Sequence, residues 1–84
     1  MPDEARTLTH TLLGQRARGG SICPSEVARA LASAGDSTFV DWRDAMPEVH
    51  AAIDQLLAEG SVRLTWKGAL LATRAGPYRI RREE

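Results

Sequence analysis

The hydrophobic pattern of the chain changes its period at Gly60, and this change constrains the fold more than any other feature. Before Gly60, apolar side chains recur every three or four residues, as on one face of a helix: Trp42, Met46, Val49, Ile53, Leu56 and Leu57. After Gly60, the apolar Val62, Leu64 and Trp66 alternate with the polar Arg63, Thr65 and Lys67. Alternation is typical of a half-buried strand. The sequence therefore predicts helices followed by a β-hairpin.

Two more helices precede this segment. Residues 4–17 and 24–34 carry apolar side chains at helical spacing, and Gly19-Gly20 stops the first of them. Pro47 interrupts the pattern of the third helix, because a proline inside a helix loses a hydrogen bond and clashes with a preceding carbonyl, at about 3 kcal/mol. We therefore expect a short helical turn over residues 41–46 and a main helix that begins at Pro47, a favourable first position.

The order of these elements predicts the fold class. Ser21-Ile22-Cys23 is too short to stand as an independent strand, so we expect it to pair with the hairpin. Tyr78 and Ile80 alternate with arginines in a closing strand. Three helices packed on a small antiparallel sheet form an α+β winged helix-turn-helix, with the β-hairpin as its wing. Residues 1–84 are expected to form one such domain.

Composition and motifs argue against several classes of function. The chain has 84 residues, of which 43% are hydrophobic and 26% charged, an ordinary globular composition. It lacks an apolar run of the ~20 residues that a membrane span needs, and its polar N-terminus does not resemble a secretory signal, so we expect a cytoplasmic protein. One cysteine and two distant histidines predict neither a disulfide nor a metal site. Without a nucleophile elbow, zinc-type spacing or phosphate loop, we expect neither an enzyme nor a cofactor.

The charges of this neutral chain are divided between its two parts. Residues 1–59 carry five arginines against nine carboxylates, a net charge of −4, whereas residues 60–84 carry six cations against two carboxylates, a net charge of +4. The third helix exposes mostly acidic and neutral side chains, which suit base readout in the major groove poorly. The hairpin cations suit a polyanion better. We therefore predict a wing-led contact with DNA or another nucleic acid, through Arg43, Arg63, Lys67, Arg74, Arg79, Arg81 and Arg82.

A second hypothesis keeps the fold without nucleic-acid binding. The hairpin cations are then a solvated strand face or a surface for an acidic protein, and the domain is a protein-interaction or homodimerisation module. Trp66 and Tyr78 are either stacking residues or core residues of the sheet, whereas Trp42 is predicted to anchor the core. Arg43 is either a ligand contact or one partner of a surface ion pair with Asp41, Asp44 or Glu48.

Several short motifs resemble one bacterial family. They are SICPSEVARAL at residues 21–31, Trp42-Arg43 followed by Met46-Pro47, LLAEG at residues 56–60, and GPYRIR at residues 76–81. In combination, over about residues 12–82, the chain resembles the domain of unknown function 3253. The resemblance implies a winged-helix-like fold and no established activity. The chain departs from the family pattern at His50, where a basic residue is expected, and in the loop ALLATRAG, where Asp-Pro is expected.

Cys23 has two interpretations. Pro24 suits the first helical position, so Cys23 takes the N-cap and Glu26 the third helical position, the spacing of a capping box. In the first interpretation, Cys23 is an inert, partly buried cap between the short strand and the second helix. In the second, it is a redox-responsive thiol, because a helix N-terminus stabilises a thiolate, although the neighbouring Glu26 carboxylate opposes one.

Overall fold

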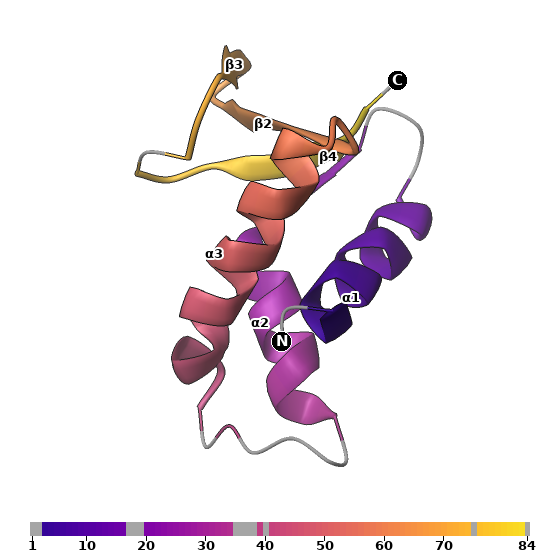
Figure 1. The fold of residues 1–84 in the computed structure, drawn as a ribbon, viewed down its shortest axis with the longest axis vertical. Coiled ribbons are helices and arrows are strands. Elements are labelled where there is room, and N and C mark those ends of the chain that lie inside the picture. The colour runs from indigo at the N-terminus through magenta and orange to yellow at the C-terminus, as the bar shows by residue number, and fades with distance from the viewer. Residues whose placement is uncertain (1–2, 17–19, 35–38, 40, 75, 84) are drawn as a thin grey trace.

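The fold combines three helices with one small sheet. The computed structural model describes residues 3–16, 20–34, 39, 41–74 and 76–83. In chain order the elements are α1 (Asp3–Gly14), β1 (Ser21–Ile22), α2 (Pro24–Ser33), α3 (Trp42–Ala58), β2 (Val62–Trp66), β3 (Ala69–Leu71) and β4 (Arg79–Arg82). Figure 1 shows the helices grouped together and the sheet lying across the C-terminal end of α3. This is the predicted α+β arrangement, and it is consistent with a winged helix.

The sheet is antiparallel, with the strand order β1-β4-β2-β3. β1 pairs with β4, and Ile22 lies opposite Ile80, so the predicted pairing of the short strand with the C-terminal strands is confirmed. β2 and β3 are joined by Lys67 and Gly68, whose φ angles of 52° and 83° are those of a two-residue hairpin turn. β4 then adds to the other side of β2.

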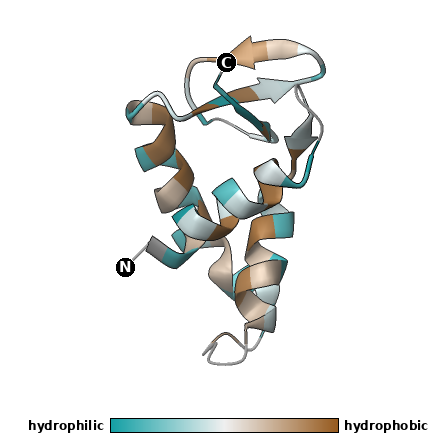
Figure 2. Cartoon of the chain, turned by 90° about the vertical axis from the view of Figure 1, so that its right-hand side faces the viewer, coloured by the Kyte–Doolittle hydropathy of each residue, from teal (hydrophilic) through white to brown (hydrophobic). Residues whose placement is uncertain are grey.

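A single core lies between the helices and the inner face of the sheet. Ile22, Leu64 and Ile80 are fully buried on three neighbouring strands. The helices contribute buried stripes of mixed size: Val27, Ala28 and Leu31 from α2, and Ala45, Val49, Ala52, Ile53 and Leu56 from α3. Figure 2 shows hydrophobic and hydrophilic residues alternating along each helix, as expected for helices with one buried face. None of the helices in the described ranges is both long and apolar enough to cross a bilayer.

The predicted break at Pro47 is wrong, because α3 runs without interruption from Trp42 to Ala58. Its first turn is held by Asp41, which accepts a hydrogen bond from the Arg43 N–H at 2.9 Å. Fully buried side chains lie on both sides of the proline, at Ala45 and Val49. Their packing offsets the hydrogen bond that Pro47 cannot donate, so the helix continues through it.

The first helix is shorter than predicted. α1 ends at Gly14 and is followed by a turn at Gln15, whereas the sequence pattern extended the helix to residue 17. Residue 17 and Gly19, part of the predicted stop, lie outside the described residues.

Candidate binding site

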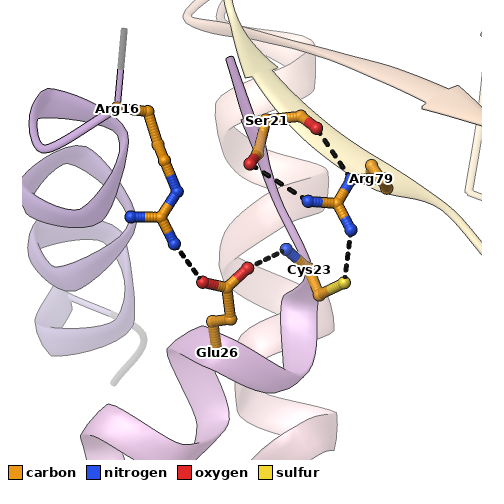
Figure 3. Close-up of polar contacts among 5 residues, drawn as sticks. All are labelled: Arg16, Ser21, Cys23, Glu26 and Arg79. Atoms are coloured by element: carbon orange, nitrogen blue, oxygen red, sulfur yellow. Dashed lines mark hydrogen bonds and ion pairs between the residues drawn. The ribbon is translucent and has the colours of Figure 1, made fainter.

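The connection between β1 and α2 is built from polar contacts that link four segments of the chain. Cys23 is the N-cap of α2 and Pro24 its first residue, as predicted. The Cys23 N–H donates to the Glu26 carboxylate at 2.6 Å, which is the Glu26 half of the predicted capping box. Glu26 also forms an ion pair with Arg16, which follows α1 (Figure 3). We call Arg16, Ser21, Cys23, Glu26 and Arg79 the polar junction.

Arg79 closes the polar junction from the neighbouring strand. Its Nε donates to Ser21 Oγ at 2.7 Å and its Nη2 donates to the Ser21 carbonyl at 3.1 Å. Its Nη1 lies 2.8 Å from Cys23 Sγ (Figure 3). Cys23 is partly buried, as the cap interpretation expects. The redox interpretation of Cys23 stays a prediction.

An open hollow lies on the other side of the same segment. It has a volume of about 380 Å³ and a mostly apolar surface. Four segments line it: the start of α2, one side of α3, the end of β2 and the loop before β4. We call it the aromatic hollow, and its lining residues are Cys23, Pro24, Ser25, Trp42, Met46, His50, Trp66, Gly76, Pro77 and Tyr78.

Local periodicity explains how these side chains meet. Trp42, Met46 and His50 recur every four residues, so they lie above one another on α3. The register that pairs Thr65 with Arg79 brings Trp66, one residue further, beside Tyr78. Because side chains alternate along a strand, Trp66 lies on the face opposite to Arg63 and Arg79. The hollow is therefore formed where the helical and strand patterns converge.

Two polar side chains that line the aromatic hollow are paired with each other. His50 Nδ1 and the Tyr78 hydroxyl are 2.7 Å apart. Burial raises the pKa of Tyr78, whose side chain is only 5% exposed. Burial, followed by the nearby Arg74 guanidinium, lowers the pKa of His50 below 6.5, and Asp54 partly opposes this. His50 and Tyr78 thus already satisfy part of their hydrogen-bonding capacity within the domain.

Two guanidinium groups lie against the Trp42 ring at the edge of the hollow. The Cζ atoms of Arg29 and Arg43 are 4.8 and 4.7 Å from the ring centroid, within the range of cation–π contacts. Arg43 also contacts the Asp41 carboxylate at 3.4 Å, the ion pair that the sequence analysis weighed against a ligand contact. Trp42 is only partly buried and packs against the core, so its predicted anchoring role is confirmed.

The seven cations predicted to contact nucleic acid have different surroundings, although the strand register places Arg63, Arg79 and Arg81 on one face of the sheet. Arg63 pairs with Glu83, and Arg74 makes two hydrogen bonds to Asp54, at 3.0 and 3.1 Å. Arg79 is held in the polar junction, whereas Lys67 is exposed in the β2–β3 turn and Arg43 lies on Trp42. Arg81 and Arg82 are partly buried, and the buried Nε of Arg81 is without a hydrogen-bond partner in the described ranges.

Trp66 and Tyr78, each predicted to be either a core residue or a stacking residue, differ in their burial. Tyr78 is a core residue, whereas Trp66 is 39% exposed, so the core interpretation is wrong for Trp66. Neither the periodicity nor the charge pattern of the sequence assigns Met46, His50 or Pro77 to a site. Met46 belongs to the motif Trp42-Arg43 with Met46-Pro47, and Pro77 belongs to GPYRIR. The structure brings these two motifs and SICPSEVARAL together at the hollow.

Fold and site together define a small α+β domain, consistent with a winged helix, that carries an apolar hollow rimmed by arginines. The chain belongs to the family described as protein of unknown function (DUF3253), whose family model matches residues 2–83. The resemblance drawn from its motifs is thereby confirmed. A search of curated proteins found no match.

Proposed function

We propose that this domain is a protein-interaction module, and that the aromatic hollow receives a bulky apolar side chain from a segment of a partner protein. The observation that carries the proposal is the exposure of aromatic and other apolar side chains around an open hollow. Exposed apolar hollows of this kind mark interaction sites, because burying their surface against a partner is favourable. Trp and Tyr are also the side chains that anchor protein interfaces most often.

The charges of the domain favour a protein over nucleic acid. Nucleic-acid affinity needs several cations that act together on the phosphates. Arg63, Arg74 and Arg79 are already engaged within the domain. The charged side chains of α3 are mostly carboxylates, which repel a phosphate backbone: Asp44, Glu48 and Asp54. The predicted wing-led contact with nucleic acid is therefore tested as the alternative to protein binding.

The surface of the hollow favours an apolar group over a nucleobase. A base is recognised by hydrogen bonds to its edges as well as by stacking. The His50 and Tyr78 side chains bond to each other, and the surface of the hollow is mostly apolar. A protein side chain such as Trp, Phe or Leu needs no such partners, so it fits this surface better.

A peptide-display selection on the full chain tests the proposal. Random peptides are selected on the wild type and then re-tested on two variants, Trp66→Ala and Leu70→Ala. Both residues are exposed on the hairpin strands, but only Trp66 lines the aromatic hollow. We expect selected peptides to bind the wild type and Leu70→Ala alike and to lose about tenfold or more in affinity for Trp66→Ala.

Equal binding to Trp66→Ala, or failure to enrich any peptide, contradicts the proposal. In parallel, short duplex and single-stranded DNA are titrated at salt concentrations between about 50 and 200 mM. A steep, salt-dependent affinity for DNA that survives in Trp66→Ala and falls in Lys67→Gln supports the wing-led contact instead. Light scattering on the same samples tests the dimerisation alternative, for which a dimer at all concentrations is the expected result.

A further inference from the structure

We propose that the segment bound in the aromatic hollow is acidic: one aromatic side chain fills the hollow, and neighbouring carboxylates bind Arg29 and Arg43. This inference rests on the proposed function and names the chemistry of the partner. It is carried by the two guanidinium groups on Trp42 and by the balance of charge around the lining residues.

The contacts with Trp42 hold the guanidinium groups of Arg29 and Arg43 in positions from which they can donate hydrogen bonds to a carboxylate. A guanidinium that lies against an indole ring keeps its N–H groups in its own plane, where they reach solvent and match the two oxygens of a carboxylate. Arg29 is exposed and forms no ion pair within the described ranges. Arg43 is 70% exposed, and its contact with Asp41 is long, at 3.4 Å. Both groups therefore have donors free for a ligand.

The charges close to the hollow have an excess of cations. Five cations touch lining residues, adjoin them in sequence or act on them electrostatically: Arg29, Arg43, Lys67, Arg74 and Arg79. Three carboxylates do so, and each has an arginine partner: Glu26, Asp41 and Asp54. The net charge of +2 around an apolar surface attracts an acidic segment and repels a cationic one, such as a methylated lysine.

The volume of the aromatic hollow limits how many side chains of the partner can enter it. Its volume of about 380 Å³ lies near the lower end of the ~300–1,000 Å³ that is usual for ligand sites. A space of this size accepts one or two side chains rather than the face of a helix. The partner is therefore an extended or irregular segment with a single aromatic anchor, and the carboxylates flank that anchor.

Three synthetic peptides separate the anchor from the charge. The probes are acetyl-Glu-Asp-Trp-Glu-Asp-amide, its neutral counterpart acetyl-Gln-Asn-Trp-Gln-Asn-amide, and acetyl-Glu-Asp-Ala-Glu-Asp-amide, which lacks the anchor. Each is titrated into the isotope-labelled full chain, and the indole N–H signals of Trp42 and Trp66 report binding in the hollow. We expect the acidic Trp peptide to bind about fivefold more tightly than the neutral one at about 50 mM salt, and this ratio to approach one at about 500 mM.

Variants of Arg29 assign the effect to the arginine. Arg29→Gln should abolish most of the preference for the acidic peptide, and Arg29→Lys should restore only part of it, because a lysine keeps the charge but lacks the planar pair of donors. Arg82→Gln is the matched control, since Arg82 pairs with Val62 at the other end of β2 from Trp66. Its preference should equal that of the wild type.

The outcomes distinguish the two proposals. If both Trp peptides shift the indole signals with equal affinity, or if Arg29→Gln keeps the preference, the acidic partner is excluded and the hollow remains a protein-binding site. If neither Trp peptide shifts the signals of Trp42 and Trp66, the proposed function fails as well. If the Ala peptide binds as tightly as the acidic Trp peptide, charge alone drives binding and the anchor is excluded.

Discussion

The polar junction and the aromatic hollow lie on two sides of the same short segment. Side chains of the junction are paired inside the domain, whereas apolar side chains of the hollow are left exposed to solvent. In the polar junction, Glu26 bridges Arg16 and the Cys23 N–H, and Arg79 makes three contacts across to β1 and Cys23. In the hollow, apolar groups such as Trp66 stay exposed. Cys23 belongs to both, since it contacts Arg79 and lines the hollow.

Because of this difference, the polar junction contributes to the stability of the fold, whereas the aromatic hollow contributes to binding. Contacts that are satisfied inside the domain stabilise its fold, whereas apolar surface left in water gains free energy only when a partner covers it. Substitutions in the polar junction should therefore lower the free energy of unfolding, and substitutions in the aromatic hollow should mainly weaken binding. The three predictions that follow test this division in order of expected effect.

Replacing Ile22 tests the core beneath the junction. Ile22 is fully buried opposite Ile80, so Ile22→Ala leaves a cavity and should lower the free energy of unfolding by about 2–5 kcal/mol. Urea denaturation followed by circular dichroism measures the change. The control is Leu70→Ala, at a side chain that is 64% exposed, which should change stability by no more than about 0.5 kcal/mol. Similar losses in the two variants would contradict the burial of β1.

Replacing Arg79 tests the junction itself. Arg79→Met keeps much of the side-chain length but leaves the Ser21 hydroxyl and carbonyl without their donor, and should cost about 1–3 kcal/mol of unfolding free energy. Arg82→Met is the control on the same strand and is expected to be nearly neutral. If the two variants are equally stable, Arg79 is a solvated cation and is available for the predicted contact with nucleic acid.

Replacing His50 should give the smallest change in the free energy of unfolding, and this change should depend on pH. Its pKa is lowered in the folded chain, so below about pH 6.5 the unfolded chain binds the proton more readily than the folded one. The free energy of unfolding of the wild type should therefore fall, relative to His50→Gln, as the pH drops through this range. The loss should stay below about 1 kcal/mol, because the site is open to solvent.

The difference in unfolding free energy between the wild type and His50→Gln at low pH can also contradict this prediction. Once the folded-state His50 is also protonated, the difference should become constant. A difference that grows in favour of the wild type at low pH would mean that protonated His50 is stabilised, and that its pairing with Tyr78 is not as described.

Local patterns predicted the elements of this fold well, because helical and strand periods act within a few residues. The pairing of Ile22 with the C-terminal strands followed from the same reasoning, since so short a strand needs a partner. The break predicted at Pro47 was wrong because the cost of one proline is local, whereas the residues that pack against the buried side chains of α3 come from other parts of the domain.

The site was less accessible to prediction than the fold. The charge pattern identified the hairpin cations, but it could not show that Arg74 meets Asp54 or that Arg79 turns toward Cys23. These contacts join residues 20 and 56 positions apart. The aromatic hollow likewise needs the strand order of the sheet to bring Trp66 toward α3. Strand alternation singled out Trp66 and Tyr78, but no sequence pattern joined them to Met46 and His50 on α3.

The most direct test of the account is a chemical-shift map of the full chain with a peptide selected on it. If the aromatic hollow binds the peptide, the largest shifts occur at Trp42, Met46, Trp66 and Tyr78, and a short DNA duplex at the same concentration leaves these signals unchanged. Shifts confined to the outer face of the sheet, at Arg63, Arg81 and Leu70, with either ligand would contradict it and would make the hairpin, not the hollow, the binding surface of this domain.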